Sequence, residues 1–92
     1  MRVIHEIPIT SRCPVNNGHD SYVCTIETNR LVNVEDIIAA ITELTKEPAF
    51  QEDLTVRLSH RLDCKVTTVG WHSGVKTTAT AGEDDVYERG RR

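Results

Sequence analysis

A cysteine and an aspartate stand seven residues apart near the start of the chain, and this pair of side chains is suited to nucleophilic chemistry. Cys13 lies between an arginine and a proline, within a stretch of turn-forming residues that predicts a loop from Ser11 to Asp20. A neighbouring cation favours the thiolate, which is the nucleophilic form of cysteine. A loop that folds back would bring Asp20 beside the sulfur as a proton carrier. The alternative is a small buried cysteine and an aspartate that caps a turn.

The carboxylate of Glu52 has two possible roles, because this residue lies near the start of a predicted helix. An acidic residue in the first helical turn interacts favourably with the helix dipole. A buried carboxylate at this place can instead accept the paired N–H groups of a guanine-like ring. The residue types leave both roles open.

The other cysteines and the histidines are scattered, and we expect no metal site. Cys24 shares a strand face with apolar residues and is interpreted as part of the core, as is Cys64. Zinc remains an alternative if the fold gathers the ligand types that this metal prefers. The ligands would then be Cys13, His19 and either Cys64 or His72.

Length and composition describe one soluble domain. The chain has 92 residues, of which 38% are hydrophobic and 27% charged, and its net charge is −3. This balance excludes a disordered chain and a strongly basic nucleic-acid binder. The longest apolar run, from Ile37 to Ile41, is too short to span a membrane, and no targeting signal is visible. We expect a cytoplasmic protein with free thiols, a single domain over residues 1–82 and a charged tail over 83–92.

Hydrophobic periodicity predicts four strands and two helices. The expected strands cover residues 3–9, 21–28, 64–71 and 75–81, and the expected helices cover 34–46 and 48–63. Pro8 places the first strand at a sheet edge, Pro48 suits the first turn of the second helix, and Trp71 is expected to pack. The second helix would present one apolar face, made of Phe50, Leu54, Leu58 and Leu62.

This order predicts an α+β protein with an antiparallel sheet, β-β-α-α-β-β. The four strands would form one sheet with both helices on one face, because an amphipathic sheet needs cover on its apolar side. The open edges of this sheet have few charges to protect them. We therefore expect subunits to join edge to edge.

The segment from Cys13 to Asp20 resembles a loop of the 7-cyano-7-deazaguanine (preQ0) nitrile reductase family, QueF, in which Cys-Pro-Val precedes an aspartate at the same spacing. Phe50-Gln51-Glu52 resembles the Phe-His-Glu segment of that family at a helix start. Gly74-Val75-Lys76 falls where the family has a glycine-rich hairpin. The resemblance extends over residues 12–82, and it implies the tunnelling fold (T-fold) of that family.

The resemblance also implies roles for individual residues. In the family, the cysteine attacks the nitrile carbon to form a covalent thioimide, the aspartate moves protons and the glutamate recognises the purine-like edge. Carried over to this chain, the catalytic residues are Cys13 and Asp20, and Glu52 binds substrate together with its neighbours Phe50 and Gln51. Gln51 replaces the histidine of the family.

The chain departs from the reductases where they bind the hydride donor. Their first helix carries lysines for the NADPH phosphates, whereas this chain has Glu35-Asp36-Ile37-Ile38-Ala39, and two carboxylates repel phosphate. The chain is therefore more similar to the short QueF-like branch, which adds ammonia to the nitrile on a nucleic acid and forms an archaeosine-type amidine. The resemblance then implies an amidinotransferase with ammonia as co-substrate, no bound cofactor, and tail arginines that contact nucleic-acid phosphates.

Three other functions remain open. The first is an NADPH-dependent 7-cyano-7-deazaguanine reductase of the queuosine pathway. The second is a T-fold module that binds a purine or pterin without catalysis, and the third is a metal-dependent enzyme similar to the cyclohydrolases. The resemblance further implies a homo-oligomer, a pentameric or decameric ring, and it leaves open whether the substrate is the free base, tRNA or DNA.

Overall fold

Four strands and two helices follow one another in the order β1, β2, α1, α2, β3, β4 in a computed structural model, which describes residues 1–82. The bounds are Val3–Arg12 for β1, His19–Thr28 for β2, Val34–Leu44 for α1, Gln51–Leu62 for α2, Lys65–His72 for β3 and Val75–Ala81 for β4. The predicted order of elements is therefore confirmed. The predicted tail over residues 83–92 lies outside the described residues.

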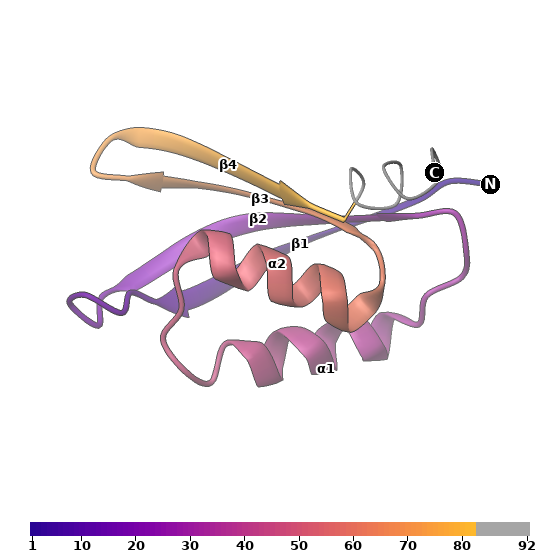
Figure 1. Cartoon of the computed structure of the whole chain (residues 1–92), viewed down its shortest axis with the longest axis horizontal. Helices are drawn as coiled ribbons and strands as arrows, with labels where there is room; N and C mark the ends of the chain where they lie inside the picture. Colours follow the sequence, from indigo (N-terminus) through magenta and orange to yellow (C-terminus); the bar gives the residue numbers. More distant parts are fainter. Residues whose placement is uncertain (83–92) are drawn as a thin grey trace, which may run out of the picture.

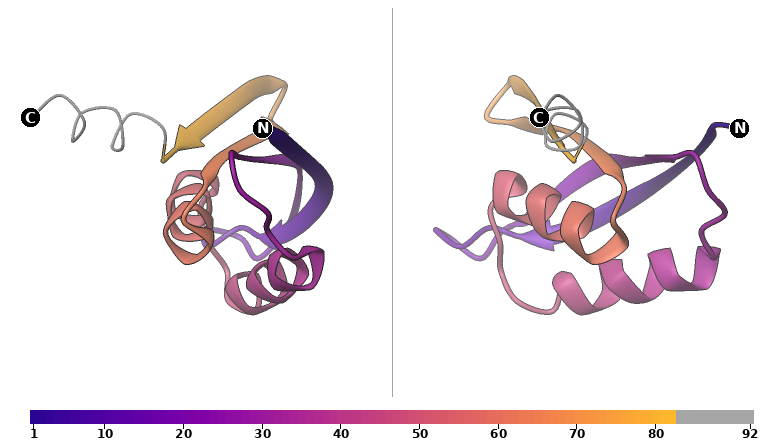
Figure 2. Two further views of the ribbon diagram at one scale, coloured as in Figure 1. Left: turned by 90° about the vertical axis from the view of Figure 1, so that its right-hand side faces the viewer. Right: turned by 45° about the vertical axis from the view of Figure 1, so that its right-hand side comes forward.

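The strands form one antiparallel sheet in the order β1-β2-β3-β4. Both helices lie on the same face of this sheet (Figure 1), and the two views in Figure 2 show the strands curving around them. β1 is an edge strand, as Pro8 predicts, because a proline has no N–H to donate to a second neighbour. The predicted α+β class and the cover on one face are confirmed.

The core lies between the sheet and the helices, and the alternation of the strands supplies one side of it. Ile26 of β2 and Val66 of β3 are fully buried against Leu54 and Leu58 of α2, and Cys24 is buried with them. Burial of each large aliphatic side chain contributes about 1.5–3 kcal/mol. The interpretation of Cys24 as a core residue is therefore confirmed. Neither helix of the described residues has the length and apolar character needed to cross a membrane.

Two expectations about the hairpins are corrected. The segment from Ser11 to Asp20 was expected to be a loop, but β1 continues to Arg12 and β2 begins at His19, so the loop spans only residues 13–18. The β1–β2 ladder outweighs the local turn signals at both ends of this segment. Trp71 does not pack, because strand alternation directs it to the face away from the helices, where it is 66% exposed.

The start of α2 also differs from the expectation. The helix begins at Gln51 and not at Pro48, and Phe50 is its N-cap and 49% exposed. The backbone N–H of Ala49 donates to the carbonyl of Arg12 at 3.1 Å, which keeps the residues before α2 extended along the end of β1. Phe50 therefore does not join the apolar face of Leu54, Leu58 and Leu62.

Candidate active site

The loop that carries Cys13 is closed by its own hydrogen bonds. The N–H of Cys13 donates to the carbonyl of Gly18, and the N–H of Asn17 donates to the carbonyl of Cys13, each at 2.8 Å. Asn17 has a φ of 60°, a left-handed conformation that asparagine tolerates better than most residues. Cys13 is half-buried at the base of this loop. The turn residues thus hold the thiol next to the end of the sheet.

Arg12 ties this loop to the segment that leads into α2. Its guanidinium donates to the carbonyl of Lys46 at 2.7 Å and to the side chain of Asn17 at 3.1 Å. The cation beside Cys13 is therefore engaged in holding the hairpin against the α1–α2 connection. Figure 1 shows the β1–β2 loop, the start of α2 and the β3–β4 turn gathered at one end of the molecule.

Asp20 lies on the helix-facing side of the sheet, close to the cysteine loop. It pairs directly with Ser11 across the β1–β2 ladder, one residue pair before the loop-closing pair of Arg12 and His19. Tyr22 follows two residues later on the same face, because side chains alternate along a strand. Asp20 and Tyr22 therefore share the surface from which the Cys13 loop extends.

Tyr22 is the most buried of these polar residues, at 3% exposure, and its ring lies against Gly70 of β3. A Cβ atom at position 70 would be 2.4 Å from the Tyr22 ring, so only glycine leaves space for this arrangement. The ring of His72, two residues further along β3, has its centroid 5.8 Å from that of Tyr22. The tyrosine is therefore held in one position by β3.

The pKa of the Tyr22 hydroxyl indicates which groups lie near it. This pKa is raised to about 12, mainly by burial and to a smaller extent by the charge and hydrogen-bonding approach of Asp20, by Cys13 and by Glu52. The approach of Asp20 falls short of hydrogen-bond geometry, and the Tyr22 oxygen has no partner within residues 1–82. Three of the residues predicted from the sequence, Cys13, Asp20 and Glu52, thus lie within electrostatic reach of one buried hydroxyl.

Glu52 and Phe50 reach this end of the sheet from the start of α2. Glu52 is exposed in the first turn of the helix, and Phe50 immediately precedes the helix. The bond from Ala49 to Arg12 brings this segment beside the residue that precedes Cys13. The carboxylate and the aromatic ring are therefore accessible from solvent, so Glu52 is not the buried carboxylate considered from the sequence.

Gln51 differs from its neighbours because its side chain is buried. The amide nitrogen donates to the carbonyls of Thr68 and Thr77, at 3.1 Å and 3.0 Å, and lies 3.1 Å from the hydroxyl of Thr68. The amide oxygen lies 2.8 Å from the Nε2 atom of His72. Gln51 thus connects α2 to both β3 and β4, and in this structure its contacts are with the protein.

These contacts indicate the orientation of the Gln51 amide and the tautomer of a neutral His72. A backbone carbonyl only accepts hydrogen bonds, so the amide nitrogen of Gln51 must face Thr68 and Thr77, and its oxygen must face His72. The neutral imidazole therefore carries its proton on Nε2, and Nδ1 keeps a lone pair. Gln51 positions an imidazole from β3 next to Tyr22.

The sequence analysis missed Ser11, Tyr22 and His72 as members of this site. Tyr22 falls in the strand predicted over residues 21–28 and received no role there, and Ser11 was placed in the loop. The alternation of β2 did contain a signal for a site. Asp20, Tyr22 and Cys24 lie on one face, so a charged residue directly follows residues that face the core. His72 had no such signal, because its position depends on the pairing of β3.

The zinc alternative is not supported by the positions of its ligands. Cys64 precedes β3 and lies beside the end of β2 that is remote from His19, so it cannot join Cys13 and His19. Among residues 1–82, no three histidine, cysteine, aspartate or glutamate side chains are grouped as metal ligands. The prediction of no metal at this site stays a prediction.

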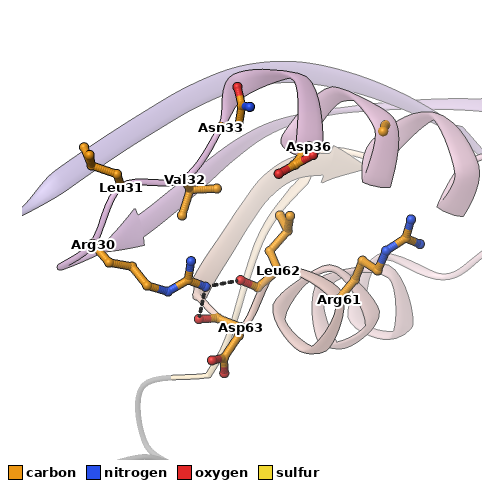
Figure 3. Close-up of a pocket in the computed structure, with 9 residues that line it drawn as sticks. Arg30, Leu31, Val32, Asn33, Asp36, Arg61, Leu62 and Asp63 are labelled. Carbon is orange, nitrogen blue, oxygen red and sulfur yellow. Dashed lines mark hydrogen bonds between the residues drawn. The ribbon is translucent and has the colours of Figure 1, made fainter.

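A pocket of about 410 Å³ lies at the opposite end of the sheet, between the β2–α1 connection and the end of α2 (Figure 3). Its lining includes Arg30, Asp36, Arg61 and Asp63. The guanidinium of Arg30 donates to the carbonyls of Leu62 and Asp63 at 2.6 Å and 3.2 Å, and so caps the end of α2. No residue predicted to act in catalysis lines this pocket, and we interpret it as part of the packing of the helix end.

Four antiparallel strands with two helices on one face, in the order found here, define the T-fold. The chain shares this fold with a solved structure described as the archaeosine synthase QueF-Like in the apo form. The two align with a TM-score of 0.75 over 87% of this chain and 90% of that chain, at 20% sequence identity. No family model matches the sequence, and no curated protein matches it significantly. The predicted T-fold is confirmed, whereas the predicted ring assembly stays a prediction.

Proposed function

We propose that this chain is an enzyme of the QueF-like type, which adds ammonia to the nitrile of a 7-cyano-7-deazaguanine group to form an amidine. The observation that carries the proposal is the meeting of Cys13, Asp20 and Glu52 around the Tyr22 hydroxyl, at the end of the sheet where the cysteine loop closes. A nucleophile, a proton carrier and an acceptor for a purine edge are the three groups that this reaction needs. The T-fold shared with the archaeosine synthase supports the same assignment.

In the first half of the reaction, Cys13 attacks the nitrile carbon. The sulfur–carbon bond forms as one π bond of the nitrile breaks, and the nitrogen gains a proton. Asp20 accepts the thiol proton and delivers it to that nitrogen, which leaves a neutral thioimide. A nitrile is a poor electrophile, and covalent catalysis divides the barrier into two smaller ones.

In the second half, ammonia attacks the thioimide carbon. The new carbon–nitrogen bond forms, the carbon–sulfur bond breaks, and one ammonia proton returns to the sulfur through Asp20. The sum is a nitrile plus ammonia giving an amidine, with no change in oxidation state. The reaction therefore needs no hydride donor, whereas reduction of the same nitrile to an amine needs two hydride equivalents.

The start of α2 supplies recognition in this proposal. The carboxylate of Glu52 accepts the paired N–H groups of the 7-deazaguanine edge, and the exposed ring of Phe50 offers an apolar contact to the base. Gln51 acts through His72, because its own amide is engaged with β3 and β4. The histidine that the family has at position 51 thus has a counterpart in an imidazole supplied by β3.

The first turn of α1 supports ammonia over NADPH. Glu35 and Asp36 are both exposed there, and their carboxylates repel the phosphates of a dinucleotide. We propose that the substrate nitrile is carried by a nucleic acid, tRNA or DNA, in the cytoplasm, and that the protein works as a homo-oligomer.

The test is a comparison of co-substrates with purified protein. An oligonucleotide that contains 7-cyano-7-deazaguanine, and separately the free base, are incubated with ammonium or with NADPH, and the products are identified by mass. The proposal predicts an ammonia adduct of the oligonucleotide that is lost in Cys13→Ala. A product reduced by NADPH would replace the proposal with the reductase, and unchanged substrates under every condition would leave the non-catalytic binding module.

A further inference from the structure

Two buried hydroxyl groups at the active-site end of the sheet have no hydrogen-bond partner within the described residues. They are the side-chain oxygens of Ser11 and Tyr22, in residues only 2% and 3% exposed. The other buried hydroxyls are paired: Thr55 bonds Thr68, and Ser59 donates to the carbonyl of Cys64 at 2.7 Å. Buried polar groups in proteins almost always have a hydrogen-bond partner, so two unpaired hydroxyl groups in one place need a physical explanation.

The two hydroxyls lie on adjacent strands and face the same region. Ser11 pairs with Asp20 across the β1–β2 ladder, and Tyr22 follows Asp20 on the same face. Cys13 follows two residues after Ser11, so both hydroxyls flank the nucleophile and its proton carrier. The third unpaired atom of the described chain, Nε2 of His5, lies further along β1 and takes no part.

We propose that Ser11 and Tyr22 form a subsite that donates hydrogen bonds to the nitrile nitrogen of the substrate, an inference that rests on the proposed function. The nitrile nitrogen is bonded to the carbon that Cys13 attacks, so it must lie beside the sulfur and within reach of Asp20. It can only accept hydrogen bonds, and it becomes more basic as the sulfur–carbon bond forms. Donors aimed at that atom stabilise the transition state more than the ground state.

The Tyr22 hydroxyl is suited to be a donor and not a base. Burial and the neighbouring acidic groups raise its pKa to about 12, so it keeps its proton across the physiological range. The ring lies against Gly70 and His72 of β3, and the hydroxyl oxygen is buried. Preorganised donors of this kind need no rearrangement when the charge develops.

The experiment measures the rate of covalent adduct formation with 7-cyano-7-deazaguanine by intact-protein mass spectrometry. Tyr22→Phe keeps the ring against Gly70 and is expected to slow the reaction by roughly 10- to 100-fold, and Ser11→Ala by about tenfold. Ser59→Ala is the matched control, since it removes a buried hydroxyl that has a partner far from Cys13. It is expected to melt at a lower temperature and to keep the wild-type rate per folded protein.

Two further readouts separate this role from a structural one. Guanine lacks the nitrile, so it should inhibit adduct formation in the wild type and in Tyr22→Phe with the same inhibition constant. Tyr22→Phe and Ser11→Ala should melt at or above the wild-type temperature, because they remove hydroxyls that are unpaired in the free protein.

The outcomes are distinct. A Tyr22→Phe rate within twofold of the wild type, or a lower melting temperature for that variant, would overturn the subsite and leave the proposed function standing. A wild-type protein that forms no adduct, either with the free base or with an oligonucleotide that contains it, would overturn the proposed function and the subsite with it. Equal loss of guanine and nitrile binding in Tyr22→Phe would show that the hydroxyl holds the fold of the site and does not contact the nitrile.

Discussion

The three cysteines of the chain have different surroundings, and only one is available to a reagent. Cys13 is half-buried in its loop, whereas Cys24 and Cys64 are buried. Burial also raises the pKa of the Cys24 thiol to about 11, which leaves about a thousandth of it as thiolate near pH 8. The difference in accessibility is a property of single residues and can be measured with a thiol reagent.

We predict that iodoacetamide modifies Cys13 first in the folded protein. Cys24 and Cys64 should react only after unfolding, so Cys13→Ser should take up almost no label under native conditions. The measurement is peptide mapping after a timed exposure. Labelling of Cys24 at the same rate as Cys13 would contradict the burial described here.

The Tyr22 hydroxyl gives a second prediction, which concerns how the stability of the protein depends on pH. Its hydroxyl has an ordinary pKa of 10.0 in the unfolded chain and about 12 in the folded protein. Below pH 10 both states are protonated and pH has no effect through this group. As the pH rises from 10 toward 12, the unfolded state ionises first, and the protein loses stability.

Urea unfolding at increasing pH, in the wild type and in Tyr22→Phe, measures this contribution. The free energy of unfolding of the wild type should fall more steeply above pH 10 than that of the variant. All other ionisable groups are the same in the two proteins, so the comparison isolates Tyr22. Parallel curves would mean that the hydroxyl is not in the surroundings described.

At the scale of elements, Gln51 connects α2 to the last hairpin. Replacement by leucine removes the amide and leaves the carbonyls of Thr68 and Thr77 and the Nε2 proton of His72 without their partner. We predict a loss of about 2–4 kcal/mol in the free energy of unfolding of Gln51→Leu, because unsatisfied buried polar groups are costly. Arg57→Ala, on the exposed side of the same helix, should change it by about 0.5 kcal/mol or less. A Gln51→Leu protein as stable as Arg57→Ala would contradict the network.

The elements themselves were largely predictable from periodicity. Alternation in the strands and the four-residue spacing of Leu54, Leu58 and Leu62 are local patterns, and they led to the correct order. The ends of elements were less predictable, because long-range contacts decide them. The bond from Ala49 to Arg12 delays the start of α2, and the β1–β2 ladder extends into residues whose types favour a turn.

The nucleophile and the two acidic residues of the candidate site were predictable from the sequence, whereas the tyrosine and the histidine were not. Cys13, Asp20 and Glu52 stand out by residue type, and the fold brings them to one end of the sheet. Tyr22 and His72 join them through the register of β2 with β3, which pairs Tyr22 with Gly70. A single sequence does not contain that register in any local pattern.

At the scale of the whole molecule, the sheet has two edge strands, β1 and β4. In an antiparallel strand, alternate residues direct their backbone groups to opposite neighbours. Pro8 has no N–H to donate to β2. Pro8 and every second residue from it, including Glu6, therefore direct their backbone groups to the free edge of β1. The free edge of β1 is therefore open to pairing with another subunit, as expected for a ring.

We predict that native mass spectrometry finds a homo-oligomer, a pentamer or a decamer. Glu6→Pro should weaken this assembly, because it removes an N–H from the free edge without breaking the β1–β2 ladder. Glu6→Ala is the matched control and should assemble as the wild type does. A monomer at micromolar concentration in the wild type would contradict edge-to-edge assembly.

The most direct test of the account is whether Cys13 forms a covalent bond with the nitrile. Intact-protein mass spectrometry after incubation with 7-cyano-7-deazaguanine, without NADPH or ammonium, compares the wild type with Cys13→Ala and Asp20→Asn. We predict an added mass equal to that of the ligand in the wild type, none in Cys13→Ala and a slower appearance in Asp20→Asn. An adduct that persists in Cys13→Ala, or no adduct in the wild type with either the free base or an oligonucleotide that contains it, would contradict the assignment of Cys13 as the nucleophile.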